Sequence, residues 1–313
     1  MAESTRDYSF WVKIATRASV SVAVILIIAK GAAWWLTGSA SMLASLTDSS
    51  LDTLASLFTF FAVRYALVPA DKEHRHGHGK AEALAAFIQS ILIFISAILL
   101  IIHSLQQWTA AETVERVDAG IYVSILAIIL TSVLITLQHK AIENTNSAAI
   151  RADKLHYTSD LLLNSAVILA LALSAWNLWW ADSVIAIGIA MYLLWNAISI
   201  LRGSLHTLLD RELPEDERQL IIKTIRETAG VQGFHGLRTR SAGPTRFISC
   251  HIELEDHLTL KQAHDIADDT EHRLQDLFES TDVLVHMDPQ SIIMDATTPS
   301  PTGSPRFNIN PPQ

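Results

Sequence analysis

Leu43-Ala-Ser-Leu-Thr-Asp48-Ser-Ser-Leu-Asp52-Thr-Leu54 carries two carboxylates inside a run of apolar and small side chains. Asp48 and Asp52 stand four residues apart, and residues at that spacing lie on the same face of an α-helix. A second pair with the same spacing, His156 and Asp160, begins another apolar run far along the chain. Two such helices side by side would bring together one imidazole and three carboxylates. The sequence therefore predicts that both helices belong to one bundle.

The composition is that of a membrane protein with a soluble part. Of the 313 residues, 50% are hydrophobic and 18% are charged, whereas roughly 25% are charged in soluble domains. The formal net charge of -9 offers no basic surface for nucleic acid. The single cysteine, Cys250, excludes an intramolecular disulfide and a zinc site built from cysteines. The polar N-terminus, 1–11, lacks the pattern of a cleaved signal, so we expect it to remain as a cytoplasmic segment.

Six apolar segments are each long enough, at about 20 residues, to cross a bilayer as a helix. They run near 12–36, 40–65, 81–107, 119–137, 152–176 and 183–205. We therefore expect a six-helix transmembrane domain over 12–208. Lys and Arg gather before the first segment and in the second and fourth loops, which places those loops and both termini in the cytoplasm. The acidic loop 112–118 and the aromatic stretch 176–182 would then face outward.

From 209 to 292 the composition changes to that of a small soluble domain. The pattern predicts a helix from Pro214 to Gly230, strands at 236–240 and 247–253, a helix at 259–278 and a strand at 283–288. The order α-β-β-α-β is typical of two layers, with helices on one sheet face. We expect the tail, 293–313, to be disordered, because it has little to bury. The predicted fold class is a multi-pass α-helical membrane protein with a cytoplasmic α+β domain.

Carboxylates inside a membrane need compensation, because each costs about 3 kcal/mol on insertion scales. A divalent cation would compensate Asp48, Asp52 and Asp160. Oxygen and imidazole ligands suit zinc, and less exclusively iron, manganese or cadmium. The alternative is that these side chains only hydrogen-bond between helices. Two matched pairs at one spacing favour the metal site.

Two further groups of polar residues could bind metal. The loop 69–80 contains three histidines and could equally be solvated. In the soluble domain, His286 and Asp288 share one face of a strand, and His251 lies on another strand. With His235 and His264 they predict a metal site, although each alone would be an ordinary polar residue. The remaining histidines are interpreted as structural or solvent-facing: His103, His139, His206, His257 and His272.

These residues stand in motifs that resemble those of the cation diffusion facilitators, from about Phe10 to Asp288. The motifs are Gly38-Ser-Ala-Ser-Met-Leu-Ala-Ser-Leu-Thr-Asp48-Ser-Ser-Leu-Asp52, Gly77-His78-Gly-Lys80-Ala-Glu82, Arg151-Ala-Asp-Lys-Leu-His156-Tyr-Thr-Ser-Asp160, Leu208-Leu-Asp210-Arg, Gly243-Pro-Thr-Arg246-Phe and His286-Met-Asp288-Pro. The resemblance implies a homodimer of six-span subunits in the bacterial inner membrane, each with a metallochaperone-like cytoplasmic domain. It further implies export of Zn²⁺ from the cytoplasm to the periplasm in exchange for protons. Membrane lipid is the other implied partner.

Site residues follow from the resemblance by position. The implied transport site comprises Asp48, Asp52, His156 and Asp160. The implied loop site comprises Asp71, His74 and His78, with His76 as an additional histidine. The implied two-metal cytoplasmic site comprises His235, His251, His264, His286 and a bridging Asp288, with Met287 where the family's pattern has glutamine. Lys80 and Asp210, which alone would be ordinary interfacial charges, would form a charge interlock that holds the dimer.

The residue types leave other metals and functions open. The Asp-Asp/His-Asp set resembles the bacterial iron/zinc branch of the family, which favours zinc and leaves iron and cadmium open. A membrane hydrolase would also need a general base or nucleophile, and no His-Glu-x-x-His or Gly-x-Ser-x-Gly motif is found. A membrane-anchored metal sensor would bind metal without transport, and it would not need ligands inside the bilayer. A passive channel would differ by the absence of proton coupling.

Overall fold

The computed structural model describes residues 2–38, 40–110, 118–174, 181–278, 280–295 and 307–308. Its contacts divide the chain into two compact units, a first of Asp7–Leu208 and a second that groups Met1–Arg6 with the stretch that begins at Leu209. The two loops predicted to face outward fall largely in 111–117 and 175–180, outside the described residues. Most of the predicted tail, 296–306 and 309–313, also lies outside them.

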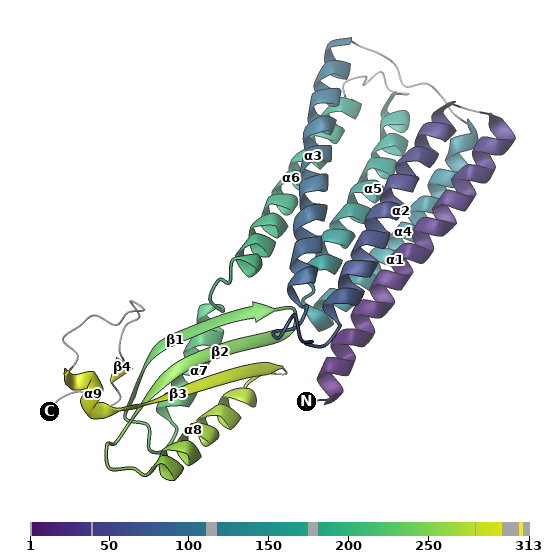
Figure 1. Ribbon diagram of the computed structural model, residues 1–313. Helices are drawn as coiled ribbons and strands as arrows, with labels where there is room; N and C mark the ends of the chain where they lie inside the picture. Colours follow the sequence, from purple (N-terminus) through teal and green to yellow (C-terminus); the bar gives the residue numbers. More distant parts are fainter. Residues whose placement is uncertain are drawn as a thin grey trace. The chain divides into compact units, whose positions relative to one another are not determined.

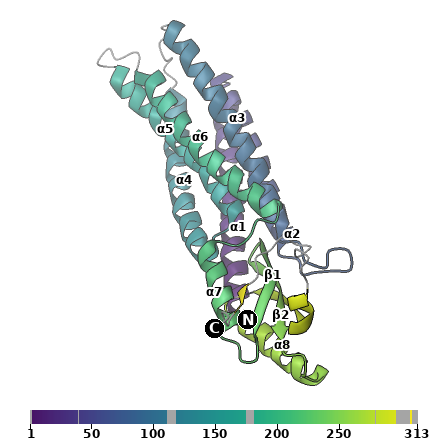
Figure 2. The ribbon, with the colours of Figure 1, turned by 90° about the vertical axis from the view of Figure 1, so that its left-hand side faces the viewer.

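Long helices side by side make up the first unit (Figure 1, Figure 2). In the described residues they are α1 (Ala2–Thr37), α2 (Ala40–Ala66), α3 (Lys80–Ala110), α4 (Asp118–Thr145), α5 (Ala148–Ser174) and α6 (Ala181–Leu208). Each overlaps one predicted apolar segment, and α1 and α4 extend well beyond theirs. α1 already begins at Ala2 and so includes most of the predicted N-terminal segment 1–11, whose cytoplasmic location stays a prediction. The helix continues there because no Gly or Pro interrupts it.

Four of these helices contain a stretch that is long and apolar enough to cross a membrane. In the described part of the chain the stretches are Asp7–Leu36, Lys80–Gln106, Val123–Thr145 and Ser183–Leu208. They fall in α1, α3, α4 and α6. Among the described residues, no such stretch is found in α2 or α5. These two helices are the ones that carry the Asp48/Asp52 and His156/Asp160 pairs.

Small side chains fill the contacts between the helices, and large apolar ones face outward. Alanines are fully buried at Ala85, Ala86, Ala141, Ala149, Ala152, Ala190 and Ala197. By contrast, Leu99, Val133 and Trp195 are exposed. This distribution is typical of helices surrounded by lipid. Burying an apolar side chain between helices gains no hydrophobic free energy there, because lipid is equally apolar, and close packing of the backbones holds the bundle together. The surface therefore supports a membrane location for the first unit.

The second unit follows the predicted order of elements. It contains α7 (Glu215–Arg226), β1 (Gly233–Ala242), β2 (Thr245–Leu254), α8 (Leu260–Gln275) and β3 (Thr281–Pro289). Two short elements extend it, α9 (Gln290–Asp295) and β4 (Phe307–Asn308). Phe307 pairs with Phe234 of β1, so these residues of the predicted tail form structure. The reason is that β1 would otherwise leave backbone donors and acceptors unpaired at a sheet edge.

The strands of the second unit form one sheet in the order β3-β2-β1-β4. β1 and β2 are antiparallel, whereas β2 and β3 are parallel, with α8 as the crossover between them. Ile248, Cys250 and Ile252 are buried on one face of β2, in a core shared with α7 and α8 (Figure 1). β1 begins at Gly233, three residues before its predicted start. Gly236 has a φ of 63°, and the register of β1 against β2 shifts there, as in a β-bulge. The strand therefore continues through this glycine and does not start at it.

Candidate metal centres

Asp52 of α2 faces His156 and Asp160 of α5 within the first unit. Ligand atoms of the three residues all lie within 4.8 Å of one another. His156 Nε2 is 3.1 Å from Asp52 Oδ1, yet this buried nitrogen has no aligned hydrogen bond in the described structure. A buried ring nitrogen that lacks a hydrogen-bond partner and lies beside two carboxylates is an arrangement that a divalent cation would satisfy.

Asp48, the fourth residue predicted for this site, lies one turn before Asp52 and outside the three-residue group. It lines a cavity of about 560 Å³ together with Asp52, His156 and Asp160. A second cavity of about 170 Å³, lined also by residues of α1 and α4, touches the same three carboxylates. The structure therefore brings three of the four predicted ligands together and places Asp48 in the walls of both cavities.

Tyr157, the neighbour of His156, connects α5 to α1 and α2. Its side chain is buried, and its hydroxyl donates a hydrogen bond to the Ser19 carbonyl at 3.1 Å. The same hydroxyl lies 2.7 Å from Ser56 Oγ. A hydroxyl both donates and accepts, so Tyr157 can satisfy both contacts at once. This pair of contacts positions the turn of α5 that presents His156.

Asp153 is a further carboxylate, one turn before His156, and only 1% of it is exposed. Its Oδ2 accepts hydrogen bonds from Ser19 Oγ at 2.6 Å and Gln138 Nε2 at 2.8 Å. Its Oδ1 accepts one from Gln89 Nε2 at 3.2 Å. These donors come from α1, α4 and α3, and they offset the cost of burying the carboxylate. Asp153 thus connects four helices beside the site.

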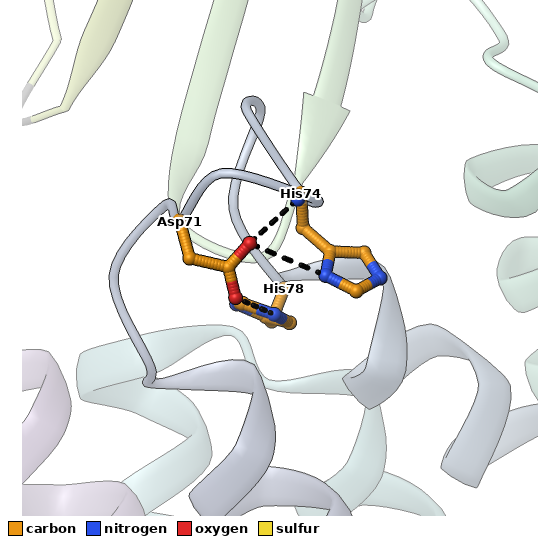
Figure 3. Close-up of side chains that lie close together, drawn as sticks. All are labelled: Asp71, His74 and His78. Atoms are coloured by element: carbon orange, nitrogen blue, oxygen red, sulfur yellow. Dashed lines mark hydrogen bonds and ion pairs between the residues drawn. The ribbon is translucent and has the colours of Figure 1, made fainter.

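The loop between α2 and α3 gathers Asp71, His74 and His78 (Figure 3). Asp71 lies between the two imidazoles, with Oδ1 3.5 Å from His74 Nδ1 and Oδ2 3.4 Å from His78 Nε2. The His78 side chain is buried, and its Nδ1 lies 3.2 Å from the Val68 carbonyl oxygen. A carbonyl only accepts, so Nδ1 is the nitrogen that donates to it. In the neutral ring, Nε2 beside Asp71 is then the nitrogen that could bind a metal ion.

The loop backbone fixes the Asp71 carboxylate. Asp71 Oδ1 accepts hydrogen bonds from the backbone N–H of His74 at 2.6 Å and of Glu73 at 2.8 Å. The His74 N–H, followed by that of Glu73, lowers the pKa of Asp71 below its ordinary value. Asp71 is therefore ionised at neutral pH, and this support of the turn is lost only as the pH falls through the lowered pKa. His76, exposed in the same loop, lies outside the three-residue group.

Strand register builds the third cluster, on the sheet face opposite the core. His235 of β1 pairs with His251 of β2, and His251 pairs with His286 of β3. Two residues farther along the parallel strands, Glu253 pairs with Asp288. Because residues two apart on a strand share a face, the acidic side chains lie on the same side as the histidines. The pairing of the strands therefore collects three imidazoles and two carboxylates.

Asp288 contacts all three imidazoles of this cluster. Its Oδ2 is 2.8 Å from His251 Nδ1 and 3.4 Å from His235 Nε2, and its Oδ1 is 3.1 Å from His286 Nε2. The second ring nitrogen of His235, Nδ1, lies 3.2 Å from Glu253 Oε1. Carboxylates that hold the second nitrogen of a histidine orient it as a metal ligand. Imidazoles therefore lie at both oxygens of Asp288, and its role as a bridge between two ions stays a prediction.

Some predicted site residues lie outside these clusters. His264 is exposed on α8 and is not among the described residues whose ligand atoms lie together, so its role stays a prediction. Lys80 Nζ donates to the Leu208 carbonyl at 3.4 Å, and Asp210 Oδ1 lies 3.7 Å from Arg240 Nη1. The Lys80–Asp210 interlock would join the two units and also stays a prediction. The five histidines interpreted as structural or solvent-facing are all exposed: His103, His139, His206, His257 and His272.

Two family matches cover most of the chain. Residues 16–209 match the cation efflux transmembrane domain. Residues 213–290 match the cation efflux protein, cytoplasmic domain. The chain belongs to the cation efflux family. This confirms the resemblance to the cation diffusion facilitators, and it makes the protein a membrane transporter of metal cations with a cytoplasmic domain after the transmembrane one.

Cation efflux relatives match along nearly their whole length. The cation-efflux pump FieF of Shewanella oneidensis is 50% identical, over 92% of this chain and 97% of the relative. The FieF pumps of Pectobacterium atrosepticum and Yersinia pestis are 45% and 46% identical, over 91% and 92% of this chain and 95% and 96% of the relatives. A solved structure of CzrB in its zinc form is 28% identical over 26% of this chain and 94% of that chain, with a TM-score of 0.24. That score is too low to carry an argument.

Three polar residues beside the cation efflux sites are absent from the sequence-based predictions. Asp153 precedes His156 and Asp160 at spacings of three and seven, which is a helical face. Glu253 is two residues from His251, on the same strand face. Lys30 is the only charge in the apolar run 24–36. For Asp153 and Glu253 the signal is the position relative to a residue already singled out, and for Lys30 it is the charge inside an apolar run.

We expect Asp71→Asn to weaken zinc binding at the loop site by at least about tenfold while the turn keeps its shape. The amide oxygen can still accept the backbone hydrogen bonds of His74 and Glu73, but it lacks the charge that attracts a cation. Zinc titration of full-length protein that also carries Asp52→Ala and Asp288→Ala would isolate this site.

Asp71→Ala is the comparison for this experiment, because it removes both the charge and the acceptor of the turn. Loop order can be followed by hydrogen exchange at the N–H of His74. Equal zinc affinity in the Asp71→Asn protein and its parent would show that the carboxylate is not a ligand.

Proposed function

We propose that this cation efflux protein exports Zn²⁺ from the cytoplasm to the periplasm in exchange for protons, with Fe²⁺ and Cd²⁺ as further substrates. The observation that supports this most is the buried His156 Nε2, which lies beside Asp52 and Asp160 and lacks an aligned hydrogen bond. One imidazole with carboxylate oxygens is a ligand set that suits zinc in a tetrahedral site. The name of the curated relatives, cation-efflux pump, supports the direction of transport.

In the proposed arrangement, α2 and α5 complete six membrane spans. Their polar side chains face one another across the Asp52–His156 contact rather than the lipid. We place both termini in the cytoplasm of a bacterial inner membrane, because Lys72 and Arg75 of the α2–α3 loop carry positive charge. The protein would work as a homodimer, in which Lys80 and Asp210 form the interlock.

Proton coupling follows from the chemistry of the ligands. Histidine binds a metal through a neutral nitrogen and aspartate through an ionised oxygen, so metal loading releases protons and protonation expels metal. Asp52, His156 and Asp160 serve both cargoes with the same atoms. A site that opens alternately to the two sides of the membrane would therefore move zinc one way and protons the other.

The cytoplasmic cluster would regulate transport. An ion held by Asp288 and its histidines would link β1, β2 and β3, and it would favour whichever conformation of the dimer binds it better. The α2–α3 loop, with Asp71 and His78, would bind metal on the cytoplasmic side of the membrane. Both sites would respond to the ion that the transport site exports.

Paired fluorescence of a zinc indicator and a pH indicator in proteoliposomes tests this function. With a proton gradient imposed, we expect zinc to enter the vesicles while protons leave. A protonophore, which collapses the proton gradient, should abolish this zinc uptake. Zinc movement at an unchanged rate without proton flow would indicate a passive channel. Zinc binding without movement under any gradient would indicate a metal sensor instead.

A further inference from the structure

Lys30 is a cation within the candidate membrane span Asp7–Leu36 of α1. Charged side chains inside a span are costly, and those that occur have a partner that compensates them. Lys30 is half-buried, and its Nζ donates hydrogen bonds to Ser49 Oγ at 2.5 Å and to the Ser45 carbonyl at 3.3 Å. Both acceptors are neutral, so they fix the position of the ammonium without balancing its charge.

The opposite charge is in the cavity that Lys30 lines. This cavity of about 170 Å³ is also lined by Asp48, Asp52 and Asp160. Ser45 and Ser49 stand on the same helix as Asp48, three residues before it and one after it. The ammonium is therefore held against α2, in a wall of the cavity that the carboxylates share.

We propose that Lys30 is a fixed counter-cation of the transport site, and that it sets how tightly and how selectively the carboxylates hold a divalent cation. This inference rests on the proposed transport function. With ionised ligands, three carboxylates carry three negative charges, which one divalent cation and one ammonium balance together. In surroundings of low polarity a neutral cavity is strongly favoured over a charged one.

The position of Lys30 also determines how it acts on the cargo. Held by two hydrogen bonds to α2, it is a positioning residue that repels an incoming cation through space and leaves the ligand positions to Asp52, His156 and Asp160. The repulsion makes zinc binding weaker than the carboxylates alone would give, and it helps the ion to leave. A transporter needs this balance, because a site that binds its cargo too tightly releases it slowly.

The test is zinc uptake by full-length protein in proteoliposomes, measured against zinc concentration at one fixed proton gradient. We expect Lys30→Met, which keeps the length of the side chain and removes its charge, to lower the half-saturating zinc concentration at least tenfold. Its maximal rate should fall as well, because the ion leaves more slowly. Lys30→Arg, which keeps the charge, should stay within about threefold of the wild type in both quantities.

The fall in half-saturating concentration separates the proposal from a structural role, since a packing defect would lower the maximal rate without tightening zinc binding. An unchanged or raised half-saturating concentration in Lys30→Met would overturn the proposal. So would an equal change in Lys30→Arg.

Ser49→Ala provides a second variant if Lys30→Met does not fold. It removes one hydrogen bond that holds the ammonium on α2 and keeps the charge, so the ammonium can move toward the carboxylates and compete with zinc. We expect the half-saturating concentration to rise severalfold in this variant, and no change would contradict the proposal.

Asp52→Ala, assayed in parallel, separates the two levels of inference. If Asp52→Ala transports zinc like the wild type, the transport site itself is wrong. If Asp52→Ala is silent while Lys30→Met equals the wild type, the role of Lys30 alone is wrong.

Discussion

Asp52→Ala is expected to lower the rate of zinc transport by at least about a hundredfold. The change removes the carboxylate that faces His156 Nε2 at 3.1 Å and leaves an imidazole and Asp160 to hold the ion. The methyl side chain removes the charge without adding bulk, so the packing of α2 against α5 should survive. Zinc flux in proteoliposomes under an imposed proton gradient gives the measurement.

Two variants make this result specific. Asp269→Asn changes an exposed aspartate of α8 whose partner is Arg273, and it should transport like the wild type. Asp48→Ala tests the ligand that lies outside the three-residue group. A loss as complete as that of Asp52→Ala would show that Asp48 moves into the site when metal binds, and a partial loss would limit the metal to three protein ligands. Normal transport by Asp52→Ala would refute the site.

Asp288→Ala should lower zinc affinity in the cytoplasmic domain by at least about a hundredfold. Asp288 contacts His235, His251 and His286, all within 3.4 Å, so its loss disconnects the three imidazoles together. The measurement is competition with a chelator of known affinity, on full-length protein that also carries Asp52→Ala and Asp71→Ala. These two changes remove the other clusters from the titration.

A matched control lies on the same strand. Asp282 is exposed on β3 and points to the same face as Asp288, because the two are an even number of residues apart. Asp282→Ala should bind zinc like its parent protein. Similar losses from both changes would mean that the strand, and not the ligand, had been damaged.

The helical spacing of ligands makes the membrane site accessible to prediction. Positions four apart in one helix fix a face, so the Asp48/Asp52 and His156/Asp160 pairs by themselves indicate two facing helices. The same local rule does not reveal the neighbours on other helices. Ser19 and Asp153 are 134 residues apart, and nothing in either segment indicates that they touch. Lys30 escapes prediction for the same reason, since its partners belong to α2.

In the cytoplasmic domain, β2 buries Ile248 and Cys250 on one face, as the alternation of side chains along a strand predicts. It cannot predict which residues stand opposite one another, because register depends on turn geometry and crossovers. The early start of β1 shows this limit. Gly236 is predicted to begin the strand, and it instead has positive φ at a bulge, which leaves His235 inside the ladder. A Cβ at this glycine would come within 3.0 Å of the His251 ring.

On the proposed function, the alignment of His235, His251 and His286 across three strands would let zinc stabilise the correctly paired sheet. The parallel pairing of β2 with β3 is non-local, because α8 lies between them in the sequence. A slip by one residue would turn His286 and Asp288 toward the core. Zinc bound at this cluster stabilises the correct pairing by mass action. On the proposed function, the yield of folded exporter therefore rises with the concentration of the ion that it removes.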